Sequence, residues 1–124
     1  MIDREMSLEN LFRTRHPEHE LYVVFLRVQK HLDRASLAGA ELLRQHFLYW
    51  WELEEQGKLL GAGPFDLGMP EECGMAILIA GSLDEAQELA VNEPLHKGGW
   101  RRNEVHRWQL NEGLAVALVE RLLS

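Results

Sequence analysis

The sequence lacks several features that would place it in large classes of protein. It holds one cysteine, Cys73, which can form neither an internal disulfide nor a thiolate metal site, and this suits a reducing compartment. Its longest uncharged run, residues 73–83, is roughly half of the ~20 apolar residues that cross a membrane. Residues 1–20 are acidic and interrupted by charge, unlike a signal peptide. We therefore expect a cytoplasmic protein without a membrane partner.

Positive charge is also scarce. The chain has 13 Lys and Arg against 20 Asp and Glu, a formal net charge of -7. Nucleic-acid affinity comes mainly from basic residues that neutralise phosphates, so we expect no nucleic-acid partner. Four basic residues nevertheless gather late in the chain, at Lys97, Arg101, Arg102 and Arg107. Such a cluster can hold one small anion, although a bare run of charge is more often a solvated surface.

The signatures of common cofactor and metal enzymes are missing as well. The sequence has no G-x-G-x-x-G, no P-loop, no H-E-x-x-H, no G-x-S-x-G and no C-x-x-C. His16 and His19 have H-x-x-H spacing, but no helix or strand pattern frames them, so a loop is favoured over a metal site. We expect no cofactor and no bound metal.

The 124 residues are 46% hydrophobic and 27% charged, which is the balance of one folded domain. Apolar runs, turn residues and helix formers divide the chain into alternating elements. The expected elements are a strand at 21–28, a helix at 36–56 capped by Ser36 or Asp33 and ended by Gly57, strands at 58–65 and 74–81, a helix from Ser82, a strand at 103–110 and a helix at 112–123 started by Asn111.

The helix that starts at Ser82 has the clearest boundaries. Ser82 and Glu85 have the S-x-x-E spacing of a capping box, in which each side chain accepts a free amide of the first turn. Pro94 disfavours helical geometry in the residue before it, so the helix must end at Asn92 or Glu93.

The order strand, helix, strand, strand, helix, strand predicts an α+β, ferredoxin-like βαββαβ fold with two helices on one face of a four-stranded antiparallel sheet. That fold places strands one and three centrally, and these are the two continuous apolar runs. We expect a single domain, 1–124, in which 1–20 form an N-terminal arm, 21–110 the ferredoxin-like core and 111–124 a C-terminal helix.

Two helices cover only one face of such a sheet, yet "YVVFLRV" and "MAILIA" leave no polar face for water. The arm or the C-terminal helix can cover the second face, but a second copy of the chain is the commoner solution for so small a domain. We expect a homodimer packed sheet to sheet, with a higher oligomer also possible.

His46 is the first candidate for chemistry. Leu43, His46, Trp50 and Leu53 follow the spacing of one helix face, so His46 points where the helix meets the sheet. A core histidine satisfied by its neighbours explains this position more economically than a catalytic one. The functional interpretation is a general acid or base at the rim of a pocket.

Glu93 is the second candidate, at the forced end of the helix before Pro94. It is a proton-transferring carboxylate if it faces inward and a solvated helix-end glutamate if it faces outward. The following His96 and Lys97, beside Gly98 and Gly99, can line a mobile lid or form a solvent-facing turn.

The chain resembles the YCII-related family in three stretches: "RQHFLYWWELEEQGKLLGAGPF", "GMAILIAGSLDEAQELAVNEPLHKGGW" and "VHRWQL". The resemblance covers about residues 21–110 and implies a dimeric ferredoxin-like, or α/β-barrel, fold. It implies a catalytic pair formed by the histidine of the first helix and the aspartate of a D-P-[YF] turn, and these match His46 and Glu93. The chain departs from the pattern because Glu93-Pro94-Leu95 has a longer acid and no aromatic residue.

One branch of that family resembles enzymes that remove chloride from a hydroxylated ring, and the fold is shared with muconolactone isomerases. A histidine and a carboxylate without a metal or nucleotide motif fit proton transfer on a small cyclic or aromatic anion. The prediction is a cofactor-independent lyase or isomerase; the alternative is a non-catalytic ligand-binding or regulatory homodimer. The expected catalytic residues are His46 and Glu93, and the expected substrate-binding residues are Trp50, His96, Trp100, Arg101 and Arg102.

Overall fold

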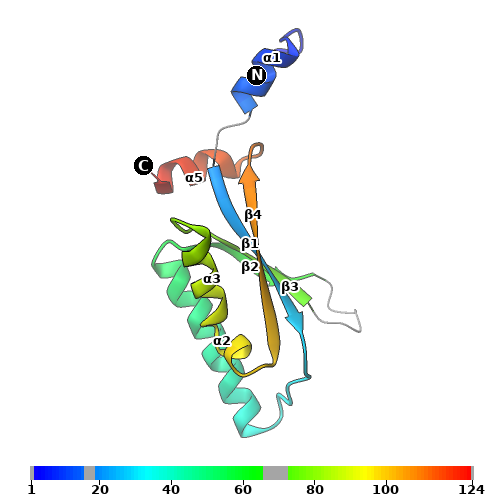
Figure 1. Cartoon of the computed structure of the whole chain (residues 1–124), viewed down its shortest axis with the longest axis vertical. Helices are drawn as coiled ribbons and strands as arrows, with labels where there is room; N and C mark the ends of the chain where they lie inside the picture. Colours follow the sequence, from blue (N-terminus) through cyan, green and yellow to red (C-terminus); the bar gives the residue numbers. More distant parts are fainter. Residues whose placement is uncertain (1, 16–18, 66–72, 124) are drawn as a thin grey trace. The chain divides into compact units, whose positions relative to one another are not determined.

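The computed structural model describes residues 2–15, 19–65 and 73–123 (Figure 1). These residues form two compact units. The terminal unit comprises the described residues of 1–20 and 108–124, and the sheet unit comprises those of 21–107. Every residue of the candidate site lies in the sheet unit. The single domain expected from the sequence stays a prediction.

Four strands form one sheet in the order β2-β3-β1-β4. They are β1 (His19–Val28), β2 (Leu59–Pro64), β3 (Cys73–Leu78) and β4 (Arg101–Leu110). Strand β3 runs antiparallel to both β1 and β2. The two most apolar strands, β1 and β3, lie at the centre of the sheet, so the ferredoxin-like α+β fold is confirmed.

Helices α2 (Leu37–Glu55) and α3 (Leu83–Val91) lie on the same side of the sheet (Figure 1). The side chain of Ser36 accepts a hydrogen bond from the Gly39 amide, so Ser36, rather than Asp33, caps α2. The Ser82 hydroxyl accepts the Glu85 amide at 3.1 Å, as the capping box predicts. The Glu85 carboxylate, however, accepts the amide of Gly81 at 2.8 Å, one residue before the cap.

The core lies between these helices and one face of the central strands. Side chains alternate along a strand, and the buried positions are Tyr22, Val24 and Leu26 of β1 and the even-numbered positions of β3. Leu21 of β1 is buried as well. The buried core cluster is Tyr22, Val24, Leu26, Trp50, Leu53, Ala76, Leu78, Ala86 and Ala90.

The odd-numbered positions form the other face, which we call the open face. Phe25 pairs with Met75, and Val23 pairs with Ile77, in the register of β1 against β3. All four of these apolar side chains are half-buried. The open face also carries charge, because Arg27 donates to Glu104 of β4 at 2.6 Å.

The segment from Pro94 to Gly99 begins as a short helix, α4 (Pro94–Lys97), that contacts α2 and α3. The solvent-facing turn that the sequence allowed is confined to Gly98 and Gly99, which are exposed. Proline is favoured at the first helical position because its missing amide would be unpaired there in any case. Strand β4 therefore starts at Arg101, two residues before its expected start.

The terminal unit holds two helices that the sequence analysis placed incompletely. Helix α1 (Leu8–Arg15) lies inside the expected arm, and the Ser7 hydroxyl accepts the Asn10 amide at its start. Helix α5 (Ala115–Leu123) begins three residues after its expected start, so Asn111 does not cap it. Gly113 has φ +116°, a left-handed conformation that no helix residue adopts, and this delays the helix.

His16 of the H-x-x-H pair lies outside the described residues. His19 Nε2 lies 3.3 Å from Glu120 Oε1, which is within the distance of an ion pair at the surface. In the part of the chain that the structure describes, no helix is long and apolar enough to span a membrane.

Candidate functional site

Helix α2 turns His46 into the space between helix and sheet. His46, Trp50 and Leu53 are buried on one face of α2, as their spacing predicts. The rings of His46 and Trp50 meet edge to face, with centroids 6.2 Å apart. This contact fixes the plane of the imidazole from the side of the following helical turn.

Glu93 points inward, and its side chain is fully buried. Helix α3 ends at Val91, and Glu93 has extended backbone angles, φ -65° and ψ 134°, as the cap of α4. One carboxylate oxygen, Oε2, accepts the amide of Leu95, and the other, Oε1, lies 3.3 Å from the donor Nδ2 of Asn103. Both oxygens thus face N–H donors, which is the arrangement that an ionised carboxylate makes.

His46 and Glu93 meet in this buried space. His46 Nδ1 lies 3.1 Å from Glu93 Oε2, within ion-pair distance. The imidazole is not turned so as to direct Nδ1 along a hydrogen bond, and Nδ1 has no hydrogen-bond partner among the described residues. Catalytic hydrogen bonds are commonly misaligned before substrate binds, so a small rotation of the ring would complete this one.

Asn103 of β4 is a member of the site that the sequence analysis missed. Its Nδ2 donates to the Ala90 carbonyl at 2.9 Å as well as to Glu93, and the whole residue is buried. Its backbone amide donates to His96 Nδ1 at 3.1 Å. The neutral His96 ring therefore carries its proton on Nε2. The sequence could have indicated this residue, because the amide side chain of an asparagine at an inward position of a strand needs hydrogen-bond partners.

Tyr49 lies beside the pair, on the helical turn between His46 and Trp50. Its hydroxyl donates to the Leu89 carbonyl. Burial, followed by the negative charges of Glu93 and Glu88, raises the pKa of Tyr49 from 10.0 to about 12. Tyr49 is thus a neutral hydrogen-bond donor at any physiological pH.

Three buried polar atoms of this cluster have no hydrogen-bond partner among the described residues. They are His46 Nδ1, Trp50 Nε1 and Asn103 Oδ1. Such atoms are rare in folded proteins because desolvation without a partner is costly, and functional sites are where they accumulate. The cluster therefore contains donor and acceptor atoms that no hydrogen bond among the described residues uses.

The structure separates the expected substrate-binding residues. Trp100 and Arg101 line a cavity of about 110 Å³ together with Leu43 and Leu95. His46, Glu93, Trp50 and His96 do not line this cavity.

Arg102 also lies away from the cavity. It donates to Glu104 at 2.9 Å, in the ion-pair group that carries Arg27 on the open face. Adjacent strand residues point to opposite faces, so Arg101 and Arg102 cannot share one ligand-facing surface.

The arrangement offers acid–base groups but no cluster of metal ligands. Across residues 2–15, 19–65 and 73–123, no three His, Cys, Asp or Glu side chains are grouped so as to hold a metal ion. A buried histidine beside a buried carboxylate can accept, hold and return one proton.

Comparison with known proteins shows the family to which the chain belongs. The sequence profile of the YCII-related domain matches residues 22–109, which is most of the chain. The chain belongs to the YCII-related family. The matched region contains His46, Glu93, Asn103 and both sides of the cavity, so all the residues described above lie within the YCII-related domain.

A solved structure shares the fold of this YCII-related chain. It is the 5-chloro-2-hydroxyhydroquinone dehydrochlorinase of Burkholderia phenoliruptrix in complex with 2,5-dihydroxybenzoquinone, with a TM-score of 0.53 and 23% sequence identity. The likeness covers 72% of this chain and 93% of that chain. At that identity it shows the fold alone. No curated protein matches the chain in sequence.

Proposed function

We propose that the chain is a cofactor-independent enzyme of lyase or isomerase type, which moves a proton on a small cyclic or aromatic anion. The observation that carries the proposal is the buried contact of 3.1 Å between His46 and a Glu93 side chain that is fully enclosed. A carboxylate held beside an imidazole stabilises the imidazolium that forms when the ring takes a proton.

The two residues take different parts in the reaction. Glu93 is held by the Leu95 amide and by Asn103, so it stays in place and supplies charge and orientation. His46 is the proton carrier, with Nδ1 toward Glu93 and Nε2 as the nitrogen that exchanges a proton with substrate. A proton removed from a ring carbon is returned at another position in an isomerase, or its loss is coupled to loss of a leaving group in a lyase.

The solved relative supports the class of substrate. That protein is named as a dehydrochlorinase of a hydroxylated, chlorinated ring, and its complex contains a dihydroxybenzoquinone. Small oxygenated rings therefore fit at least one site built on this fold. Trp100 and Arg101 beside the cavity provide an apolar wall and a cation for such an anion.

The test is a screen of chlorinated and hydroxylated quinols and small unsaturated lactones. Ultraviolet absorbance follows turnover, and proton NMR in deuterium oxide follows exchange of ring protons. His46→Gln should lower turnover at least about 100-fold, the usual contribution of a general acid or base. His19→Gln is the matched control, because His19 belongs to the terminal unit and pairs with Glu120 there. Equal rates in His46→Gln and wild type would contradict the role of His46.

A non-catalytic ligand-binding dimer is the second candidate. The observation that favours it is the structural duty of Glu93, which caps α4 whether or not any reaction occurs. In that case wild-type protein would bind ring acids but exchange no ring proton, and His46→Gln would bind them equally well.

We also propose that two copies of the chain pack through their open faces. Val23, Phe25, Met75 and Ile77 are apolar and half-buried at the centre of that face. Burial of such a surface in a second copy is favourable because it removes apolar area from water.

Light scattering at micromolar concentration should give twice the chain mass of 14.3 kDa. Phe25→Glu should reduce this to one chain, while Trp51→Glu, on an exposed position of α2, should not. A wild-type monomer, or a larger assembly that Phe25→Glu leaves intact, would contradict the proposed interface.

A further inference from the structure

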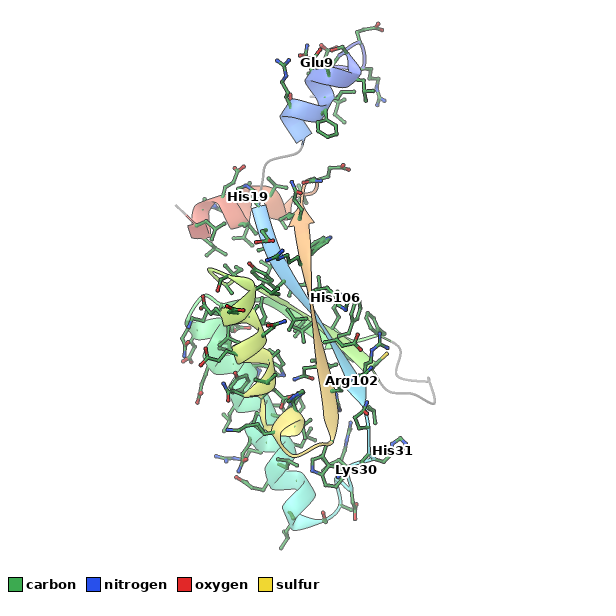
Figure 2. The ribbon with its side chains drawn as sticks, in the orientation of Figure 1. Glu9, His19, Lys30, His31, Arg102 and His106 are labelled. Atoms are coloured by element: carbon green, nitrogen blue, oxygen red, sulfur yellow. The ribbon has the colours of Figure 1, made fainter. Side chains whose placement is uncertain are left out.

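We propose that the cavity beside Trp100 is an oxyanion site that receives the carboxylate of a small ring acid. The proposal rests on the proposed function, which it deepens by naming the group of the substrate that is held and the residues that hold it. The cavity lies where the connection after β1 meets the start of β4, and its volume is about 110 Å³. Figure 2 shows Lys30 and His31 on that connection.

The lining of this cavity is basic. Lys30, His31, Arg34 and Arg101 all contribute to it, and no acidic residue is among the described residues that line it. Three of the 13 Lys and Arg of a chain with net charge -7 thus meet in one small space. A bound anion would gain favourable contacts with Lys30 and Arg101 at this cavity. The local charge is therefore set against the overall charge, as an anion site requires.

Contacts within the chain hold this arrangement before any ligand binds. The amides of Gln29 and Lys30 donate to the Trp100 carbonyl at 2.9 and 3.3 Å, which ties the connection to β4. Lys30 Nζ lies 4.9 Å from the centre of the Trp100 ring, a cation–π contact that restrains the ammonium group. Gly98 permits the packing, because a Cβ there would come within 2.8 Å of Trp100 Cδ1.

The cavity adjoins the His46–Glu93 pair without including it. Leu43 lines the cavity and lies three residues before His46 on the same face of α2. Leu95 lines it as well, and its amide donates to Glu93. Leu43 and Leu95 thus connect the lining of the cavity to the two residues of the pair. A ligand anchored at Lys30 and Arg101 can direct its apolar ring over these leucines toward His46.

The volume selects for a small ligand. A cavity of about 150 Å³ accommodates a molecule of benzene, so 110 Å³ suits a carboxylate together with part of one ring. Larger fused-ring acids do not fit this space.

The experiment measures equilibrium binding of benzoate by isothermal titration calorimetry, with inorganic phosphate as a second probe. Benzoate should bind the wild-type chain at millimolar concentration or tighter, and added sodium chloride should weaken it. Arg101→Ala should weaken benzoate at least about tenfold, the effect of losing one charge-assisted hydrogen bond. Arg102→Ala is the matched control, because the neighbouring Arg102 pairs with Glu104 on the open face.

The result separates this proposal from the proposed function. Loss of benzoate affinity in Arg101→Ala, with Arg102→Ala and His46→Gln unaffected, supports the site even if no turnover is found. Equal affinities in Arg101→Ala and Arg102→Ala, or no benzoate binding to wild type, overturns the site even if turnover depends on His46. Binding of phosphate in preference to benzoate overturns the ring-acid assignment.

Discussion

Two His–Glu pairs lie among the described residues of the sheet unit, on opposite faces of the same sheet. His46 and Glu93 are 3.1 Å apart, and their side chains are 9% and 0% exposed. His106 and Glu104 are 3.6 Å apart, and their side chains are 54% and 33% exposed. Residue types and distances are thus nearly the same, and solvent is the main difference.

The surroundings of the two acids show what burial changes. Glu104 accepts hydrogen bonds from Arg27 and Arg102, and the bond from Arg27 holds the pKa of Glu104 below its usual range. Water screens that group, so its partners are exchangeable. Among the described residues Glu93 contacts neutral N–H donors and one imidazole, and its side chain is fully buried. Electrostatic attraction between His46 and Glu93 is therefore screened less by water than attraction between His106 and Glu104.

The largest expected difference between the pairs is in stability. Glu93→Ala removes one partner of a buried pair and the cap of α4, and should lower the free energy of unfolding by about 3–5 kcal/mol. Glu104→Ala should lower the urea midpoint far less, because its ion pairs with Arg27 and Arg102 are partly exposed within one chain. Urea unfolding followed by tryptophan fluorescence measures both. Similar losses of stability in the two variants would show that the buried pair stabilises the fold no more than the exposed pair does.

A smaller effect is expected at Asn103, which supports the buried pair from β4. Asn103→Ala leaves the Ala90 carbonyl and one Glu93 oxygen without a donor, and should lower the free energy of unfolding by about 1–3 kcal/mol. Gln45→Ala, which removes an exposed amide from α2, is the control and should have no measurable effect. A neutral result for Asn103→Ala would show that Glu93 is held by the Leu95 amide alone.

The smallest effect concerns Tyr49, whose ionisation reports the charge of Glu93. Tyr49→Phe loses the bond to the Leu89 carbonyl and should lower the free energy of unfolding by about 0.5–1.5 kcal/mol at neutral pH. The folded-state pKa of about 12 lies above the unfolded value of 10.0, so the unfolded chain releases this proton first as the pH rises. The stability that Tyr49 contributes is complete below the lower value and is lost between the two.

A titration separates the causes of that raised pKa. The difference in tyrosinate absorbance between a protein and its Tyr49→Phe variant isolates Tyr49 from the other tyrosine, Tyr22. In a Glu93→Gln background the pKa of Tyr49 should fall, yet stay above its ordinary value, because burial is the largest cause. An unchanged pKa would mean that Glu93 carries no charge in the folded protein.

Local patterns in the sequence predict the buried position of His46 well, but not the direction of the Glu93 side chain. The spacing from Leu43 to Leu53 places His46 on the buried face of α2, and Pro94 places Glu93 at the end of a helix. The inward direction of Glu93 could not be predicted, because it depends on a one-turn helix, α4, that four residues form only against α2 and α3. Short helices carry too little periodicity to be recognised in a sequence.

Residues that line the cavity were harder to predict than the pair. Arg101 and Arg102 are equivalent as a run of charge, and only the register of β4 sends them to different places. The connection "QKHLDRA" after β1 has the composition of an ordinary polar link. Only the folded chain brings this connection to Trp100, which is distant in the sequence, because the amides of Gln29 and Lys30 donate to the Trp100 carbonyl.

Glu93 caps α4 and has a proposed role beside His46, and this affects how related sequences should be compared. An acid that caps α4 would be retained by selection for folding alone, even in a descendant that had lost every activity. His46 caps no helix and has no hydrogen bond at Nδ1 among the described residues, so its replacement removes fewer structural contacts than replacement of Glu93 does. Among relatives, a histidine at this position should therefore mark working members of the family better than the acid does.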